Sequence, residues 1–314
     1  MPTLPLRVLT HVPPAVLARV SEARPDVEWV EVPQEGPAPK GVSGEILLTA
    51  AWGSPNLGEL VRAAGVRWIH TVGTGVDRFP MDQVGDRVLT CARGASAIPI
   101  SEWVLAVILA LEKALPDTWI DRPPERWNAG ELGGVYGQTL GLVGIGGIGV
   151  AIAERALPFG MRVLALRRTS QPSPVDGVEI VASLAELLAR SDHLVIAAAA
   201  TPRTRHLIDA EALGQVKPGV HLINIARGSL IDQDALREAL DDGRIARASL
   251  DVCEPEPLPE DHWLYRHPRV RLSPHCSWIA PGALDRLFDT FVDNLGRWER
   301  DDPLTGQVDL KQRY

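Results

Sequence analysis

The chain contains 314 residues, of which 45% are hydrophobic and 23% are charged, and it carries a formal net charge of −8. This length and composition predict a globular protein with about two domains and a sizeable core. The acidic balance and the lack of a long basic run argue against a nucleic-acid groove and against an anionic membrane as a partner.

The first hundred residues alternate between short apolar runs and amphipathic stretches. Runs at Leu6–Leu9, Glu45–Thr49 and Arg67–Thr71 are bounded by turn residues, which is typical of strands. Between them, Pro14–Ser21 and Asn56–Ala64 show the spacing of helices. Strands that alternate with helices in this way predict βαβ units and a parallel sheet.

A long amphipathic helix is predicted at Ile100–Leu115. A connector rich in Pro and Gly follows over residues 116–134 and carries Trp119 and Trp127. A second series of strands and helices then begins. Its predicted strands are Thr139–Val143, Arg162–Leu166, Leu194–Ala198, Val220–Asn224, Arg247–Asp251 and Val270–Leu272. Nearly continuous apolar strands of this kind are typical of a parallel sheet that is covered on both faces.

The last amphipathic helix is predicted at Leu284–Trp298, after the final strand of the second sheet. It must therefore pack on something outside that sheet, and the simplest arrangement returns the chain to the first domain. We expect an inner domain of residues 101–282, inserted into a discontinuous outer domain of residues 1–100 and 283–314. A hinge near residues 100 and 282 would let the two domains close.

The most informative local pattern is the glycine-rich loop of the inner domain. The predicted strand Thr139–Val143 runs directly into Gly144–Gly149, which reads Gly-Ile-Gly-Gly-Ile-Gly, and an apolar helix follows at Val150–Leu157. A glycine-rich turn can exist without a ligand, but the sequence strand–loop–helix is the context in which this pattern predicts a dinucleotide-binding site.

Each glycine of the loop has a physical reason to be there. Gly144 permits the tight turn, Gly146 lets the backbone approach a pyrophosphate, and Gly149 lets helix and strand pack closely. The amides at the start of the helix, including those of Gly147 and Ile148, would face the phosphates.

The residues at the end of the second strand of this unit bear on which dinucleotide is bound. A site that prefers NAD usually has an acidic residue there, whereas this chain has Arg167, Arg168 and Thr169. Guanidinium groups pair well with a 2′-phosphate, so the sequence predicts a preference for NADP(H), with NAD(H) possible. The alternative is that both arginines are solvated surface residues.

Three titratable or charged side chains follow later strands of the same sheet. Arg227 follows one strand, Glu256 lies after the next, and His275 comes shortly after the last. The carboxyl ends of parallel strands meet at one edge of an open α/β sheet, where ligands bind. We therefore expect these three side chains to form a catalytic group, with Glu254 as the alternative to Glu256.

At this point the sequence resembles the D-isomer-specific 2-hydroxyacid dehydrogenase family. The matching segments are Gly144–Gly149, Asn224–Asp232, Asp251–Pro257, Ser273–His275 and, near the start, Val72–Asp77. The resemblance implies an α/β fold with two Rossmann-like parallel-sheet domains. The dinucleotide-binding domain would be inserted into a discontinuous, flavodoxin-like substrate domain.

The resemblance also implies a role for each residue in the reduction of a small 2-keto acid, with glyoxylate and hydroxypyruvate as the first candidates. His275 would be the general acid/base, Glu256 would hold its imidazole, and Arg227 would bind the substrate carboxylate and carbonyl. Further substrate contacts would come from the backbone of Val72, Gly73 and Thr74. Further cofactor contacts would come from Thr201, Pro202, Ala226 and Asp251.

Two tryptophans are ambiguous at this stage. Trp52 and Trp278 could cap a small or apolar substituent of the substrate, or they could be packing residues. Cys253 and Cys276 flank the predicted site, and we interpret them as packing residues and not as nucleophiles.

The remaining expectations concern context. The three cysteines are far apart and form no Cys-x-x-Cys pair, so we expect no disulfide framework and no metal, and a cytoplasmic protein. The sequence shows no signal-peptide pattern, so we do not expect secretion. It shows no long C-terminal addition, so we do not expect a regulatory domain. The resemblance implies a homodimer, to which the two long amphipathic helices would contribute; the alternative is that both helices pack within one chain. The alternatives to a 2-keto acid reductase are a phosphite dehydrogenase-like oxidoreductase and a dinucleotide-sensing corepressor.

Overall fold

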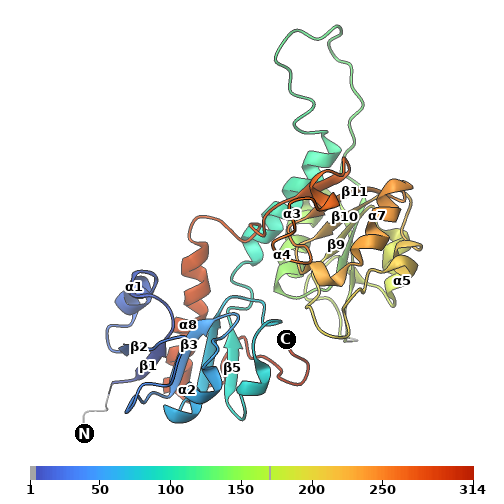
Figure 1. Ribbon diagram of the computed structural model, residues 1–314. Helices are drawn as coiled ribbons and strands as arrows, with labels where there is room; N and C mark the ends of the chain where they lie inside the picture. Colours follow the sequence, from blue (N-terminus) through green and yellow to red (C-terminus); the bar gives the residue numbers. More distant parts are fainter. Residues whose placement is uncertain (1–4, 170) are drawn as a thin grey trace. The chain divides into compact units, whose positions relative to one another are not determined.

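The computed structural model describes residues 5–169 and 171–314, and the chain divides into two compact units. Unit 1 combines the segment that ends at Ser96 with Ala280–Tyr314, and unit 2 consists of Ala97–Ile279. The chain therefore leaves unit 1, builds unit 2 and returns to unit 1 for its last helix (Figure 1).

Unit 1 is built on a five-stranded parallel sheet in the order β2-β1-β3-β4-β5. This is the flavodoxin-like order. The strands are β1 Arg7–Thr10, β2 Glu28–Glu31, β3 Ile46–Ala50, β4 Trp68–Val72 and β5 Val88–Cys91. The helices are α1 Pro14–Ala23, α2 Leu57–Ala63 and α8 Ala283–Glu299, with a 3-10 helix at Met81–Gln83.

Helix α8 completes the core of unit 1 although it comes from the far end of the chain. Its side chains Phe288, Phe291 and Leu295 are buried in a cluster with Trp68 of β4. The rings of Trp68 and Phe291 lie 5.3 Å apart between centroids. The apolar face that the sequence assigned to this helix is thus covered inside unit 1.

Unit 2 is built on a seven-stranded parallel sheet in the order β12-β11-β10-β9-β6-β7-β8. This is the doubly wound Rossmann order with one additional strand. The strands are β6 Thr139–Val143, β7 Arg162–Leu166, β8 Val178–Ile180, β9 His193–Ile196, β10 Val220–Asn224, β11 Ile245–Leu250 and β12 Val270–Leu272. The two sheets confirm the expected fold class.

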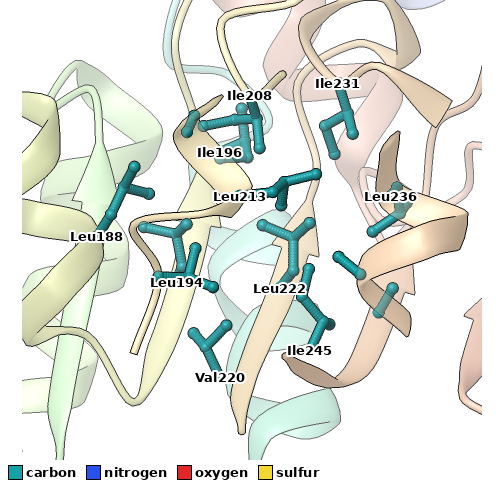
Figure 2. Close-up of a cluster of buried hydrophobic side chains, with 14 of the residues drawn as sticks. Leu188, Leu194, Ile196, Ile208, Leu213, Val220, Leu222, Ile231, Leu236 and Ile245 are labelled. Atoms are coloured by element: carbon teal, nitrogen blue, oxygen red, sulfur yellow. The ribbon is translucent and has the colours of Figure 1, made fainter. Parts of the chain in front are cut away.

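Helices cover both faces of this second sheet. They are α3 Ala97–Glu112, α4 Gly147–Ala156, α5 Leu184–Arg190, α6 Ala210–Leu213 and α7 Gln233–Asp241, with 3-10 helices at Leu157–Phe159, Gly228–Leu230 and Trp263–Tyr265. Alternate residues of β9 enter different cores: Leu194 joins one cluster with Leu222 and Leu236 (Figure 2), and Val195 joins the other with Ile108.

The structure differs from the expectation at the sheet edges. Strands β2 and β8 lie at the outer edge of their sheets, and β5 lies at the other edge of the sheet of unit 1; none of the three was predicted from the sequence. In β2 and β8 no residue is fully buried, so neither carries the apolar run that marks an inner strand. Within residues 5–169 and 171–314, no helix combines the length and apolar character needed to cross a membrane.

Candidate active site at the carboxyl edge of unit 2

The glycine loop joins β6 to α4 in the geometry that a dinucleotide needs. Gly144 has φ +104°, a conformation that favours glycine, and Gly146 precedes α4 without a side-chain cap hydrogen bond. A Cβ on Gly149 would lie 2.6 Å from the Gly144 carbonyl oxygen, whereas a Cβ on Gly146 would meet no atom within 4 Å. Gly149 therefore serves the packing, and the open space at Gly146, beside the amides of Gly147 and Ile148, fits a pyrophosphate.

The end of β7 carries cations and no carboxylate. Nη1 of Arg167 donates to the carbonyl oxygens of Gln171 (3.2 Å) and Pro172 (2.5 Å), so this guanidinium lies over its own loop. Arg168 and Thr169 are exposed. Residues 167–169 thus offer no acidic partner to a ribose.

Arg227 is held in place by Asn224, the last residue of β10. The buried Asn224 amide donates to the Arg227 carbonyl oxygen (2.8 Å), and its Oδ1 accepts the amide of Ala226 (3.0 Å). The next residue, Gly228, packs closely against the loop that carries Cys253. A Cβ on Gly228 would lie 2.0 Å from the Cys253 carbonyl carbon. The turn that carries Arg227 is therefore fixed from both sides.

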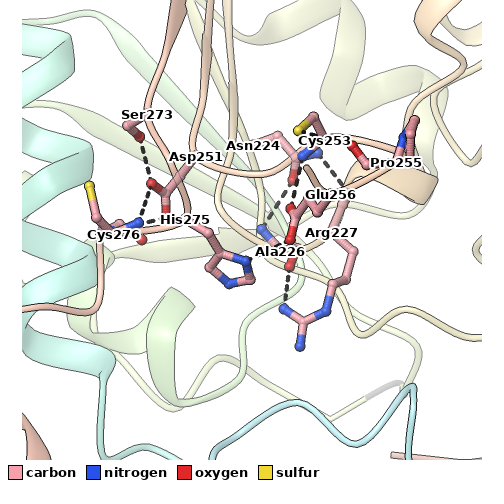
Figure 3. A network of polar contacts seen from close by, with 11 residues as sticks. Asn224, Ala226, Arg227, Asp251, Cys253, Pro255, Glu256, Ser273, His275 and Cys276 are labelled. Atoms are coloured by element: carbon pink, nitrogen blue, oxygen red, sulfur yellow. Dashed lines mark hydrogen bonds and ion pairs between the residues drawn. The ribbon is translucent and has the colours of Figure 1, made fainter. Parts of the chain in front are cut away.

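Glu256 and His275 meet directly. Nδ1 of His275 lies 2.9 Å from Oε2 of Glu256, and Oε1 of Glu256 accepts the amide of Cys253 at 3.0 Å. Figure 3 shows the imidazole directed toward Glu256, with Arg227 beside the carboxylate. The acidic partner of His275 is Glu256, whereas Glu254 pairs with Arg205.

The environment of Glu256 favours its ionised form. Burial raises its pKa, but the hydrogen bond from His275, the Cys253 amide and the positive charge of Arg227 together outweigh burial and hold the pKa below its ordinary value. An ionised carboxylate only accepts hydrogen bonds, so it fixes Nδ1–H on its own side of the ring. Nε2 of His275 is then the nitrogen that can exchange a proton with a substrate.

The neighbouring thiol of Cys253 is not set up as a nucleophile. Burial and the nearby Glu256 raise the pKa of Cys253 to about 11, so that the thiolate is scarce at neutral pH. Cys276 contributes its backbone amide to Asp251. Across the described residues no group of three or more His, Cys, Asp or Glu side chains could hold a metal ion.

Asp251 lies immediately after β11 and is 1% exposed. Its Oδ1 accepts the Ser273 hydroxyl (2.5 Å) and the Cys276 amide (2.9 Å), and its Oδ2 accepts the Ser277 amide (3.0 Å). The carboxylate therefore binds the turn that carries His275. The sequence predicted a cofactor contact for Asp251 and no role of their own for Asn224, Ser273 and Ser277.

Other residues that the sequence predicted for the site lie at the same edge of the sheet of unit 2. Thr201 and Pro202 follow β9 in a turn where the Thr201 amide donates to Thr204 Oγ1 (2.8 Å). Ala226 is half-buried beside Arg227. Trp278 is partly buried against the core that α3 and α4 share, which supports the packing interpretation of this indole.

Four residues that the sequence predicted as substrate contacts lie in unit 1, at the carboxyl ends of β3 and β4. Trp52 is 67% exposed. Gly73 has φ +139°, and its carbonyl oxygen accepts the Ala92 amide (2.9 Å). Thr74 Oγ1 donates to the Ala92 carbonyl (3.1 Å), and Val72 ends β4. These contacts give residues 72–74 a fixed shape within their unit.

Residues 105–277 match the sequence profile described as the NAD-binding domain of D-isomer-specific 2-hydroxyacid dehydrogenases. The chain is 33% identical over 220 residues to D-3-phosphoglycerate dehydrogenase of Methanocaldococcus jannaschii, a match that covers 68% of this chain and 42% of that protein. The chain thus spans less than half of that longer relative. It is 32% identical to human glyoxylate reductase/hydroxypyruvate reductase, with 79% of this chain and 78% of that protein covered.

Among solved structures, the fold is similar to a D-isomer-specific 2-hydroxyacid dehydrogenase of Xanthobacter autotrophicus, crystallised with NADPH and MES. The TM-score is 0.84 at 26% identity, over 99% of this chain and 100% of that one. The similarity extends through both units.

Proposed function

Since this chain belongs to the D-isomer-specific 2-hydroxyacid dehydrogenase family, we propose that it reduces a small 2-keto acid to the D-2-hydroxy acid with a nicotinamide dinucleotide. The observation that carries the proposal is the contact of 2.9 Å between His275 Nδ1 and Glu256 Oε2, beside Arg227 at the carboxyl edge of the sheet. The name of the human relative favours glyoxylate and hydroxypyruvate as substrates.

In this reaction the three side chains divide the work. The nicotinamide, when bound, supplies the hydride. His275 donates a proton from Nε2 to the carbonyl oxygen, and the ionised Glu256 stabilises the imidazolium that gives it. Arg227 binds the substrate carboxylate and polarises the carbonyl through its fork of donors. The resemblance assigns further substrate contacts to the backbone of Val72, Gly73 and Thr74, and the exposed Trp52 is a candidate to cap a substituent of the substrate.

We further propose that the dinucleotide is preferentially NADP(H). The cations Arg167 and Arg168, with Thr169, take the place of the acidic residue that binds an unphosphorylated ribose. The related Xanthobacter protein was crystallised with NADPH. Thr201, Pro202, Ala226 and Asp251 are assigned to the cofactor by resemblance.

The substitution Arg168→Gln tests this preference. It is expected to raise KM for NADPH and to leave KM for NADH unchanged. Equal kcat/KM values of the wild type for NADPH and NADH would contradict the preference.

A steady-state panel tests the proposed reaction. Glyoxylate, hydroxypyruvate, pyruvate, longer 2-keto acids and phosphite are offered with NADPH and NADH, or their oxidised forms for phosphite. We expect turnover with small 2-keto acids. Turnover of phosphite alone would replace the proposal by the phosphite dehydrogenase-like alternative. Tight dinucleotide binding without any turnover would replace it by a corepressor-type binding protein.

A further inference from the structure

The turn that carries His275 holds an unusual backbone conformation. His275 has φ +53°, in the left-handed region that a residue with a Cβ rarely adopts. Its amide donates to the carbonyl oxygens of Asp251 (2.9 Å) and Ser273 (3.0 Å). Because such a conformation persists only when its surroundings enforce it, the groups that hold this turn determine where the imidazole lies.

The buried carboxylate of Asp251 binds this turn on both sides of His275. The Ser273 hydroxyl precedes the histidine, and the amides of Cys276 and Ser277 follow it. In Figure 3 the contacts of Asp251 with Ser273 and Cys276 lie on one side of His275, and Glu256 with Arg227 lies on the other. The register of the sheet brings the partners together, since Leu250 pairs with Leu272 and the next residues along the two strands are Asp251 and Ser273.

Resting on the proposed function, we propose that Asp251 is a positioning residue for proton transfer: its carboxylate clamps the turn Ser273–Ser277 and thereby holds His275 Nδ1 against Glu256. This role is separate from the nicotinamide contact that the resemblance assigns to Asp251. At 1% exposure the carboxylate is turned toward the protein, and each of its oxygens already accepts a hydrogen bond.

The substitution Asp251→Asn tests the clamp with almost no change in volume. If the amide oxygen keeps the bonds to Ser273 and Cys276, the amide nitrogen faces the Ser277 N–H, and two donors then oppose each other. We expect kcat to fall about 100-fold, because a small misplacement of a reacting group has an effect of that order. The dissociation constant of NADPH, measured by fluorescence, should change much less than kcat, because the glycine loop is intact.

Two further variants separate the clamp from a general loss of stability. Ser273→Ala removes one donor and keeps the carboxylate, so a smaller fall in kcat is expected, and it serves as the test if Asp251→Asn does not fold. Asp192→Asn is the matched control. Asp192 accepts hydrogen bonds from the Thr139 amide (2.8 Å) and from Lys217 Nζ (2.5 Å) at the amino ends of the strands of the same sheet, away from His275. It should keep the wild-type kcat.

Crystal structures of the wild type and of Asp251→Asn provide a readout that needs no substrate. We expect the variant to lose the positive φ at His275 and the contact with Glu256. An unchanged turn in the variant would overturn the proposal, as would a weaker affinity for NADPH at an unchanged kcat. If the wild type turns over no 2-keto acid, the proposed function fails, but the two structures still decide whether Asp251 holds the turn.

Discussion

At the scale of single residues, the site is a set of side chains that are each held by a neighbour. Asn224 fixes the turn of Arg227, and Glu256 fixes the ring of His275. The net lowering of the Glu256 pKa keeps the carboxylate charged at neutral pH, so it can stabilise an imidazolium in the transition state. The proposed chemistry therefore depends on one proton at Nε2 of His275.

The substitution His275→Gln removes this proton and keeps a side chain that can bind Glu256. We expect kcat to fall by about 10²–10⁴-fold, the usual contribution of a general acid/base. The affinity for NADPH should be unchanged, because the glycine loop is intact. Stopped-flow measurement of NADPH oxidation checks kcat and a fluorescence titration checks binding; a variant with wild-type turnover at neutral pH would refute the role of His275.

The sequence indicated Arg227, Glu256 and His275 because each follows a strand whose carboxyl end must face the ligand edge. It did not indicate that Asn224 and Asp251 hold the backbone around these residues. Asn224 ends a buried strand, and nothing in its position tells that its amide turns back onto Ala226 and Arg227. The orientation of Asp251 likewise depends on the pairing of β11 with β12, which is a tertiary fact.

At the scale of elements, the junction of β6 and α4 separates two demands on the glycine loop. Gly149 lies against the backbone of Gly144, so the helix can approach the strand only without a side chain there. Gly146 faces open space and has φ −84°, which any residue can adopt. One glycine is therefore required by the fold, and we propose that the other is required by the dinucleotide.

Two alanine substitutions distinguish these demands. Gly149→Ala should lower the free energy of unfolding by about 1–3 kcal/mol, the typical cost of overpacking, and weaken NADPH binding as well. Gly146→Ala should change that free energy by less than about 0.5 kcal/mol but weaken NADPH binding by about tenfold or more. Urea unfolding without dinucleotide and fluorescence titration measure the two effects. A Gly146→Ala protein with wild-type affinity would exclude this loop as the pyrophosphate site.

A buried row of polar side chains crosses β9, β10 and β11 at the other end of the sheet. His193 Nδ1 lies 3.2 Å from His221 Nδ1, His193 Nε2 lies 2.6 Å from Gln138 Oε1, and His221 Nε2 lies 2.8 Å from Ser249 Oγ. Burial lowers the pKa of His193 to about 4 and holds that of His221 well below its ordinary value. Both imidazoles are therefore neutral in the folded protein.

This row predicts a loss of stability in mild acid. Between pH 6.5 and about 4 the unfolded chain protonates His193 and the folded chain does not, so falling pH favours unfolding. For His193 alone the effect is about 3 kcal/mol across that window. Urea midpoints should fall from pH 7 to pH 5. The dependence of the urea midpoint on pH should be weaker in His193→Gln and unchanged in the control His206→Gln, whose side chain is 41% exposed. Midpoints that do not depend on pH would refute the assignment.

The pattern of elements was largely readable because inner parallel strands are continuous apolar runs. Strands β6, β7, β10 and β12 have the bounds that the sequence indicated. The edge strands β2 and β8 were not predicted because they are short and only half-buried. Their strand conformation depends on pairing with a neighbouring strand in the folded protein.

At the scale of the whole molecule, the homodimer stays a prediction, but its expected basis changes. Helices α3 and α8 bury Ile108 and Phe291, respectively, inside their own units, so their apolar faces are already covered. Exposed apolar side chains gather instead on the segment between α3 and β6, where Trp119 is 74% and Trp127 is 70% exposed. Figure 1 shows this segment as a loop that extends away from the sheet of unit 2.

We expect sedimentation equilibrium at micromolar concentration to give twice the mass of one chain. The double variant Trp119→Ser/Trp127→Ser should shift the equilibrium toward the monomer, since tryptophans at interfaces contribute strongly to binding. Trp52→Ser, which removes a similarly exposed indole from unit 1, is the control and should stay dimeric. A monomeric wild type would contradict the prediction.

The most direct test of the central claim is analysis of the reaction product. The protein is incubated with NADPH and glyoxylate or hydroxypyruvate, and the consumption of NADPH is compared with the product that forms. We expect one 2-hydroxy acid for each NADPH oxidised, and with hydroxypyruvate the D enantiomer on a chiral column. NADPH that remains unconsumed with every 2-keto acid, or formation of the L enantiomer, would contradict it.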